Sequence, residues 1–236
     1  MLDKKKILIF TATYNEKENI ENLIHSINNF NSNVDILIID DSSPDFTYIQ
    51  IQNLQKKYKN IFLKVRNFKL GLDTAHKEAY EYAKLNNYDY LITMDADLSH
   101  DPKEISNFVN FLNDFPFVIG SRYTEGGNCL MTGGRLFMSK FGNKLIKKVL
   151  KINSNEFTTS YRGFNLAKLK NFHLNKVKNK GYSFFMGTLF ELDKLGYEIK
   201  EIPITFQDRK KGSSKIPKVE ILRTLKNLLI LFFKKN

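Results

Sequence analysis

Short apolar runs alternate along the chain with longer segments in which apolar residues recur every three or four positions. The runs predict buried strands, and the longer segments predict amphipathic helices. The predicted strands are residues 6–12, 34–39, 61–65, 90–94 and 117–120. The predicted helices are residues 20–27, 48–58, 74–85, 135–152 and 218–235, and one that opens at residues 101–102. This alternation predicts an α/β sandwich around a mostly parallel sheet. No internal repeat or low-complexity linker interrupts it, so residues 1–236 are expected to form a single domain.

Polar side chains stand at the ends of three predicted strands, at residues 14–16, 40–41 and 95–97, and most of them are acidic. In open α/β sheets, ligands bind beyond the carboxyl ends of the strands. An acidic edge of this kind favours a divalent cation as its counter-charge. The phosphate-binding patterns GxxxxGK[ST] and GxGxxG are absent from the sequence.

Asp95 and Asp97 are the best candidates for metal ligands, because residues i and i+2 of an extended segment share a face. Hard oxygen ligands suit Mg²⁺ or Mn²⁺ shared with a substrate diphosphate. Most isolated Asp-x-Asp sequences are strand caps or turns. This one follows the fourth predicted strand and two earlier polar clusters, which favours the metal site.

The cysteine and histidine content excludes other kinds of site. The single cysteine, Cys129, excludes an internal disulfide framework and a cysteine-rich zinc site, and it suits a reducing compartment. The four histidines show no metal-ligand spacing. No stretch approaches the ~20 apolar residues of a spanning helix, and residues 7–10 are too short an apolar run for a signal peptide. We therefore expect a cytoplasmic protein, soluble or peripheral to a membrane.

The net charge of +12 is divided unevenly. Residues 1–118 contain 13 Lys and Arg against 17 Asp and Glu, whereas residues 119–236 contain 24 against 8. A basic half indicates nucleic acid, an anionic membrane surface or a phosphorylated substrate, or else a lysine-rich solvated surface. RNA-binding motifs and helix-turn-helix spacing are not evident, so nucleic acid is not an expected partner. Only six of the 37 basic residues are arginine, which is favoured where a planar fork binds phosphate or carboxylate.

Nine groups of residues, in order along nearly the whole chain, carry a family resemblance. They are Thr13-Tyr14-Asn15-Glu16, residues 40–45, Leu70-Gly71-Leu72, residues 95–102, Gly120-Ser121-Arg122-Tyr123, Arg135 with Ser139 and Asn143, Gly181-Tyr182, residues 202–206, and Arg209 with Gly212, Ser214 and Lys215. On these residues the sequence resembles the family 2 glycosyltransferases, and within them the dolichyl- or polyprenyl-phosphate mannose synthases. The resemblance implies a GT-A fold and an inverting hexosyltransferase. It also implies a nucleotide-sugar donor (GDP-mannose by default), a divalent metal and a lipid-phosphate acceptor.

The resemblance assigns expected roles to individual residues. Those expected to line the base and ribose pocket of the donor are Ala12, Tyr14, Glu16 and Asp41. Those expected to hold the metal are Asp95, Asp97 and Ser99, and Asp95 is also expected to contact the donor. Those expected to bind the acceptor phosphate are Arg122, Arg135 and Ser139. Those expected to clamp the donor diphosphate are Arg209 and Lys215. The residues expected to act in catalysis are Asp97, Arg122, Arg135 and Arg209.

Several positions depart from the family pattern. Relatives often read Gly-Tyr-x-Phe-Gln-x-Glu where this chain has residues 181–187, so Phe185 and Gly187 stand at the Gln and Glu positions. Residues 156–162 read Glu-Phe-Thr-Thr-Ser-Tyr-Arg where relatives read Asp-x-Thr-Ser-Gly-Phe-Arg, and Asp73 replaces a common Gly. These departures affect the identity of the sugar more than the type of reaction. Arg162 stands at a family motif position, and the alternative is that it supports the fold by pairing with a core carboxylate. For Arg122, the alternative to a phosphate ligand is a surface residue that follows a strand.

The lack of a clear catalytic base agrees with a phosphate acceptor. A phosphate monoester has its second pKa near ~6, so it already carries an anionic oxygen at neutral pH. The nearest alternative is a UDP-glucose-dependent transferase that acts on a prenyl phosphate or a polysaccharide. More distant alternatives are a basic nucleic-acid-binding protein and an inactive scaffold.

Two predicted helices have the composition of membrane-surface helices. Residues 135–152 contain an apolar stripe with five lysines largely off it, and the alternative is a core-facing helix with a solvated lysine side. Residues 218–235 include six consecutive apolar residues, too few to span a bilayer. Both helices are expected to bring the acceptor arginines to lipid phosphate at the membrane surface. A small membrane-anchoring subunit is a further candidate partner.

Overall fold

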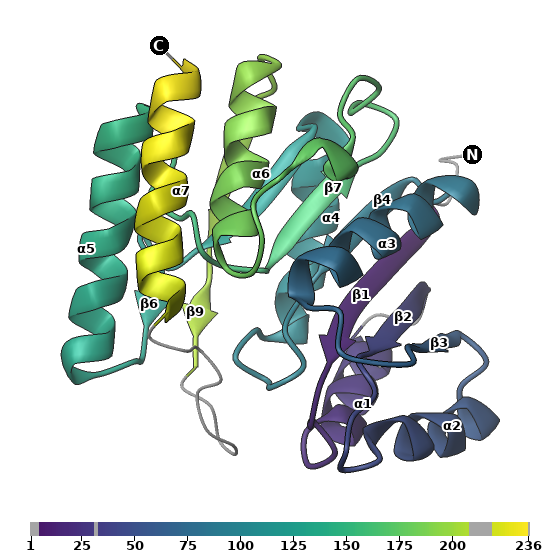
Figure 1. Cartoon of the computed structure of the whole chain (residues 1–236). Helices are drawn as coiled ribbons and strands as arrows, with labels where there is room; N and C mark the ends of the chain where they lie inside the picture. The colour runs from purple at the N-terminus through teal and green to yellow at the C-terminus, as the bar shows by residue number, and fades with distance from the viewer. Residues whose placement is uncertain (1–4, 31–32, 208–218, 236) are drawn as a thin grey trace.

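A seven-stranded sheet forms the centre of the protein, for which a computed structural model describes residues 5–30, 33–207 and 219–235 (Figure 1). Its strands are β1 (Ile7–Thr13), β2 (Val34–Asp40), β3 (Ile61–Val65), β4 (Tyr90–Thr93), β5 (Phe117–Ser121), β7 (Arg162–Asn165) and β8 (Ile199–Pro203). They lie in the order β3-β2-β1-β4-β7-β5-β8. Two short strands, β6 (Asn128–Cys129) and β9 (Thr205–Phe206), pair separately. The sheet joins the acidic and basic halves of the chain.

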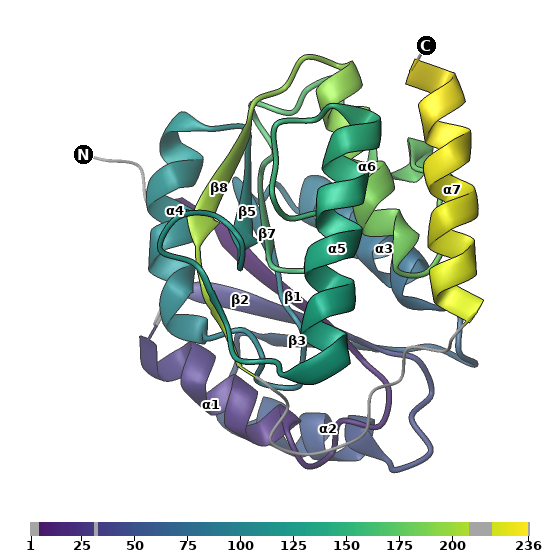
Figure 2. The same ribbon diagram turned by 90° about the vertical axis from the view of Figure 1, so that its left-hand side faces the viewer.

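In the described part of the chain, seven α-helices cover the two faces of the sheet (Figure 2). They are α1 (Ile20–Phe30), α2 (Thr47–Lys57), α3 (Leu72–Leu85), α4 (Ile105–Asp114), α5 (Gly133–Leu150), α6 (Ser183–Lys194) and α7 (Val219–Lys235). Two 3₁₀ turns, η1 (Pro102–Glu104) and η2 (Leu174–Lys176), complete the helical elements among the described residues. One core cluster contains residues of α1, α2 and α4, and the other contains residues of α3, α5, α6 and α7.

The alternation of side chains along the strands explains this two-sided core. In β1, Leu8 and Phe10 belong to the cluster under α3 and α6, whereas Ile9 belongs to the cluster under α1 and α4. All three side chains are fully buried. Burial of such a side chain stabilises the fold by roughly 1.5–3 kcal/mol. The central strand is therefore apolar on both faces, as in α/β proteins with helices on both sides of the sheet.

The prediction of a mostly parallel sheet is confirmed, with one exception that shapes the site. β7 runs antiparallel to both of its neighbours, β4 and β5. Its first residue, Arg162, pairs with Thr93 near the end of β4 and with Ile119 near the end of β5. β4 and β5 are therefore parallel to each other. The segment that leads into β7, residues 156–161, lies at the carboxyl ends of both strands.

Candidate functional site

The carboxyl ends of β1, β2 and β4 lie side by side, as the sequence predicted. β1 pairs with β2 on one side and with β4 on the other. The N–H of Asp41 donates to the carbonyl of Thr13 at 3.0 Å, and the N–H of Met94 donates to the carbonyl of Phe10 at 3.0 Å. The three acidic clusters therefore share one edge of the sheet.

Asp41 is held by a buried arginine that the sequence did not single out. Nη1 of Arg66 lies 2.9 Å from Oδ1 of Asp41, and the N–H of Gly71 donates to Oδ2 at 2.9 Å. The other guanidinium nitrogens of Arg66 donate to Glu78 at 2.7 and 3.2 Å. Both carboxylate oxygens of Asp41 thus have donors, and the predicted ribose ligand has a fixed orientation.

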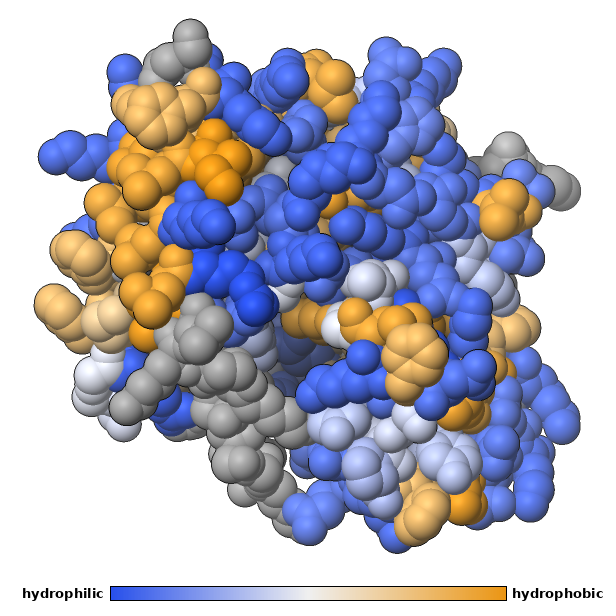
Figure 3. Space-filling model, in the orientation of Figure 1, coloured by the Kyte–Doolittle hydropathy of each residue, from blue (hydrophilic) through white to orange (hydrophobic). Residues whose placement is uncertain are grey.

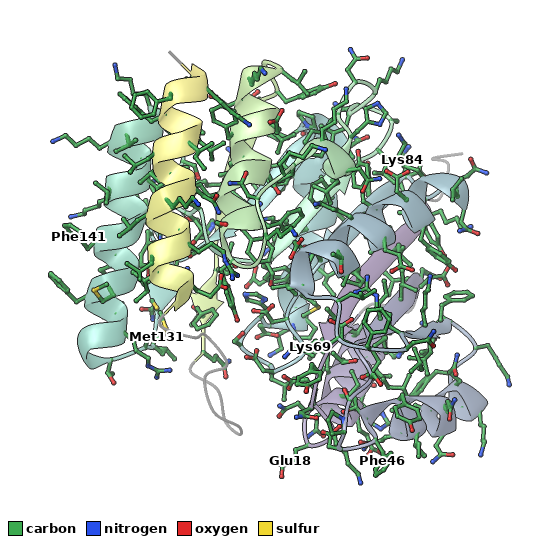
Figure 4. All side chains as sticks on the ribbon, in the orientation of Figure 1. Glu18, Phe46, Lys69, Lys84, Met131 and Phe141 are labelled. Carbon is green, nitrogen blue, oxygen red and sulfur yellow. The ribbon has the colours of Figure 1, made fainter. Side chains whose placement is uncertain are left out.

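The other predicted base-pocket residues lie within β1 or shortly after it. Ala12 is partly buried in the strand. The ring of Tyr14 lies under Lys69, whose Nζ is 3.6 Å from the ring centroid, and Figure 4 labels Lys69 in the loop before α3. The carboxylate of Glu16 accepts a hydrogen bond from Asn19 at 2.9 Å. The Tyr14–Lys69 contact brings a cation to the edge predicted to receive a nucleotide.

The predicted metal ligands form a set of oxygen donors. Asp97 is 5% exposed, while the side chain of Asp95 is 36% exposed and accepts from Oγ of Ser160 at 2.5 Å. Oγ of Ser99 is buried and has no hydrogen-bond partner among the described residues. Within that part of the chain, no cluster of three or more His, Cys, Asp or Glu could hold a metal. Two carboxylates and an unpartnered hydroxyl nevertheless fit Mg²⁺ or Mn²⁺, which keep water and substrate oxygens as further ligands.

His100, five residues after Asp95, supports this motif from the interior. Its Nδ1 accepts the N–H of Asp95 at 3.1 Å, and its Nε2 lies 3.2 Å from Oγ1 of Thr159. The ring stacks on Tyr161, with centroids 4.9 Å apart. Burial lowers the pKa of His100, against the opposing effect of the carboxylates of Asp95 and Asp97. His100 is therefore a neutral histidine buried behind the predicted metal ligands.

Arg122 is buried and paired, so the alternative surface position is wrong. It is 8% exposed, and its Nε and Nη2 donate to the two oxygens of Glu156 at 2.6 and 2.8 Å. Burial acts to lower the pKa of Arg122, but the carboxylate of Glu156 raises it overall. Burial acts to raise the pKa of Glu156, but Arg122 and Thr158 hold it below its ordinary value. Nη1 of Arg122 has no hydrogen-bond partner among the described residues, so this charged group can still donate to a ligand.

Arg162 supports the fold, as one of its two interpretations held, but the predicted pairing with a core carboxylate is wrong. It is 1% exposed, and its guanidinium donates to the backbone carbonyls of Thr159, Phe185 and Phe157 at 2.8, 2.8 and 3.2 Å. Burial lowers its pKa to about 9, with a partial opposing effect of Glu156. Arg162 thus supports the fold through carbonyl groups, and no described carboxylate forms an ion pair with it.

The remaining acceptor residues lie on α5. Arg135 is exposed, and Ser139 is one turn farther along the helix. Oγ of Ser139 accepts from the hydroxyl of Tyr123 at 2.7 Å, which ties α5 to the residue after Arg122. Arg209 and Lys215 lie outside the described residues. The N–H of Gln207 donates to the carbonyl of Ser99 at 3.1 Å, so the chain reaches the metal motif two residues before Arg209.

Comparison with known proteins decides the family. The sequence model described as glycosyl transferase family 2 matches residues 8–172. The chain belongs to this family. It is 31% identical over 215 residues to the polyprenol monophosphomannose synthase of Mycolicibacterium smegmatis, which covers 90% of this chain and 81% of that protein. It is 30% identical over 212 residues to the undecaprenyl-phosphate mannosyltransferase of Micrococcus luteus, with 89% and 87% covered. The predicted resemblance and the assignment as a glycosyltransferase are confirmed.

Solved structures confirm the GT-A fold of this family 2 glycosyltransferase. The glucosyl-3-phosphoglycerate synthase of Mycobacterium tuberculosis, solved with Mn²⁺, UDP and glucosyl-3-phosphoglycerate, superposes with a TM-score of 0.69. The match is 16% identical and covers 98% of this chain and 80% of that one. The mannosyltransferase PcManGT of Pyrobaculum calidifontis, solved with GDP-Man and Mn²⁺, gives a TM-score of 0.63 at 15% identity, with 99% and 64% covered.

Three of the positions that depart from the family pattern, Asp73, Phe185 and Gly187, lie on α3 and α6. Phe185 packs on the imidazole of His76, with ring centroids 5.2 Å apart, and on Arg162. Oδ1 of Asp73 accepts the N–H of Gly181 at 3.0 Å. A Cβ added at Gly187 would lie 2.3 Å from Oδ1 of Asn179. Because of this close approach, a Glu side chain would not fit at position 187 without rearrangement.

The glycosyltransferase also has an exposed apolar surface over two adjacent helices, which we call the α5–α7 face (Figure 3). Its exposed members are Phe137, Met138, Phe141, Ile221, Leu222, Leu225, Leu229, Ile230, Phe232 and Phe233. Phe141 points outward from α5 (Figure 4). The second half of α5 packs inward through Ile146 and Leu150, so only part of the predicted stripe is exposed. None of the described helices is both long and apolar enough to cross a membrane.

Four residues that organise the site had no role assigned from the sequence: Arg66, His100, Tyr123 and Glu156. The scarcity of arginine was a usable signal for Arg66. Its partner Asp41 is 25 positions away in the sequence, so no local pattern identified the pair. His100 and Tyr123 lie within motifs that the sequence marked, but their side-chain contacts depend on the tertiary fold.

Proposed function

We propose that this glycosyltransferase transfers mannose from GDP-mannose to a polyprenyl or dolichyl phosphate at the cytoplasmic face of a membrane. The observation that carries the proposal is the buried guanidinium of Arg122, which Glu156 holds beside the segment that also orients Asp95. This arrangement provides a fixed cation for an acceptor phosphate next to a candidate metal site. The names of the two mannosyltransferase relatives, which cover most of this chain, support the same acceptor and sugar.

The donor would bind along the acidic edge, in the half formed by residues 1–118. We assign the base and ribose to Ala12, Tyr14, Glu16 and Asp41, with Asp41 oriented by Arg66. Asp95, Asp97 and Ser99 would hold Mg²⁺ or Mn²⁺, which when bound supplies positive charge to the departing diphosphate. We also keep Arg209 and Lys215 as cations for that diphosphate.

The acceptor would bind in the half formed by residues 119–236, at Arg122, Arg135 and Ser139. An oxygen of the acceptor phosphate forms a bond to the anomeric carbon while the bond to the donor diphosphate breaks, so GDP leaves with the electron pair. In-line attack inverts the anomeric configuration. The phosphate is already anionic at neutral pH, so the step does not require a side-chain base.

The α5–α7 face would place this acceptor pocket at the membrane surface. Arg135 and Ser139 lie on α5, the helix that also carries exposed Phe137 and Phe141. Exposed lysines on the same helix, including Lys140 and Lys144, suit anionic headgroups. A helix pair of this kind can lie in the interface without crossing the bilayer. A small membrane-anchoring subunit on this face is the alternative occupant.

A donor panel tests the proposal. Purified protein is incubated with labelled GDP-mannose or UDP-glucose, Mg²⁺ or Mn²⁺, and a short polyprenyl phosphate, and the organic-phase product is counted. We expect GDP-mannose to give the product and Asp97→Ala to reduce the rate by at least ~10²-fold. A preference for UDP-glucose would refute the mannose assignment. Metal-dependent turnover retained in Asp97→Ala would refute the metal assignment.

A further inference from the structure

A buried chain of contacts joins the predicted acceptor arginine, Arg122, to the backbone N–H of the predicted metal ligand Asp95. Glu156 holds Arg122 and also accepts the N–H of Thr159 at 3.3 Å. Oγ1 of Thr159 lies 3.2 Å from Nε2 of His100, and Nδ1 of His100 accepts the N–H of Asp95 at 3.1 Å. Glu156, Thr159 and His100, which we call the bridge, are 0%, 5% and 1% exposed.

The contacts of His100 determine its tautomer. Nδ1 accepts a backbone N–H and therefore carries no proton, so the single proton of the neutral ring is on Nε2. Nε2 then donates to the hydroxyl oxygen of Thr159, which also accepts the N–H of Tyr161 at 3.2 Å. Stacking on Tyr161 and an edge contact with Phe206 fix the ring plane. The imidazole is thus held at both nitrogens and on its faces.

The chain contains a second buried histidine that makes none of these contacts. His76 is 3% exposed and packs against the rings of Phe10, Phe184 and Phe185. It lies on α3 and, among the described residues, makes no hydrogen bond or ring contact with Glu156, Thr159 or His100. A substitution at His76 therefore removes a buried imidazole without removing a contact of the bridge, which makes it a matched control.

Building on the proposed function, we propose that His100 is a positioning residue. It fixes the backbone of Asp95 against Thr159 and so sets the distance between the metal ligands and Arg122. Groups of this kind, which orient the ligands of a metal, typically change metal affinity by about 10–100-fold when removed. His100 itself binds neither metal nor substrate in this proposal.

Mn²⁺ binding in the presence of GDP, measured by electron paramagnetic resonance of the free ion, tests the role without turnover. We expect His100→Leu to weaken Mn²⁺ binding by about 10–100-fold and His76→Leu to leave it unchanged. His100→Asn, whose Oδ1 can accept the Asp95 N–H in place of Nδ1, should restore most of the affinity. Thr159→Val, which replaces the hydroxyl by a methyl group, should weaken binding in the same direction as His100→Leu.

Circular dichroism melts of all four variants separate loss of binding from loss of fold. Equal Mn²⁺ affinity in folded His100→Leu and His76→Leu would overturn the proposal, as would an unchanged affinity in Thr159→Val. No rescue by His100→Asn would also overturn it. Wild-type protein that binds Mn²⁺ with GDP but transfers no mannose would refute the proposed function alone, because the variant series still reports on His100.

Discussion

Individual side chains in this protein act through partners that lie far away in the sequence. Arg122 depends on Glu156, 34 positions later, and Asp41 depends on Arg66, 25 positions later. A guanidinium held by a buried carboxylate cannot reorient freely, so its remaining N–H groups keep a fixed direction. Arg135, by contrast, is the exposed one of the two proposed acceptor cations and lies on α5.

This difference gives a prediction for Arg135. Arg135→Lys keeps the charge but loses the planar fork, so we expect the KM for polyprenyl phosphate to rise by about 10-fold while the KM for GDP-mannose stays unchanged. Steady-state kinetics with each substrate varied in turn measure both constants. A selective rise in the donor KM would mean that the two pockets are assigned the wrong way round.

His76 makes the folded protein sensitive to acid. Burial, reinforced by the charge of Arg162, lowers the pKa of His76 to about 3. Between that value and the ordinary value of about 6.5, the unfolded chain binds more protons than the folded one, so stability falls as the pH falls through this window. The contribution amounts to about 2 kcal/mol between pH 7.5 and pH 5.

Urea denaturation at pH 7.5 and pH 5 measures this effect. We expect His76→Phe to lose about 2 kcal/mol less than the wild type over this interval. An equal acid response in wild type and His76→Phe would contradict the assignment.

Among the elements, β7 determines where residues 156–161 lie at the site. It has only four residues, and α4 packs on it closely enough that a Cβ added at Gly163 would lie 2.9 Å from Leu112 and 3.0 Å from Phe108. Glycine is required here for close packing of a helix on a strand. The antiparallel direction of β7 then places residues 156–161 between the ends of β4 and β5.

Two glycine substitutions test the packing of this element. Gly163→Ala should destabilise the protein by about 1–3 kcal/mol, because the added methyl group overpacks the contact with α4. Gly142→Ala on α5, where nothing lies within 4 Å of the added Cβ, should stabilise it by up to about 1 kcal/mol. Thermal melts give both values, and a destabilising effect of the same size at both positions would refute the packing explanation.

The whole molecule combines an acidic edge with a basic, apolar surface. The first 118 residues carry more acidic than basic side chains, while the rest carry 24 Lys and Arg against 8 Asp and Glu. The exposed apolar residues of the α5–α7 face lie in this second half. In the proposed function, charge would attract the protein to an anionic surface, and apolar side chains would then enter the interface.

Vesicle sedimentation tests this arrangement. We expect binding to anionic vesicles to exceed binding to neutral ones and to weaken as salt rises, because screening shortens the range of the attraction. Phe141→Ser should reduce the partition coefficient by roughly 10-fold or more, given about 1.5–3 kcal/mol for burial of the ring. Leu85→Ser removes an exposed apolar residue at the end of α3 and should have no effect. Equal losses in both variants would count against the α5–α7 face.

The sequence by itself determined the features that depend on local pattern. Periodicity located β1 to β5 and most of the helices to within a few residues, and it placed the acidic clusters at one edge. The motifs in chain order were sufficient to indicate the family. β8 and α6 were not predicted, and β7 is too short for its direction to be evident in a local pattern.

Only the tertiary structure decided which side chains work together. Arg122 could be predicted as a phosphate ligand, but its pairing with Glu156 depends on the direction of β7. The outward position of Phe141 and the inward position of Ile146 depend on how α5 packs beside α7, although both belong to one amphipathic helix. The physical reason is that helix and strand periodicity reflect neighbours within one element, whereas burial of a charge or exposure of a ring reflects contacts between elements.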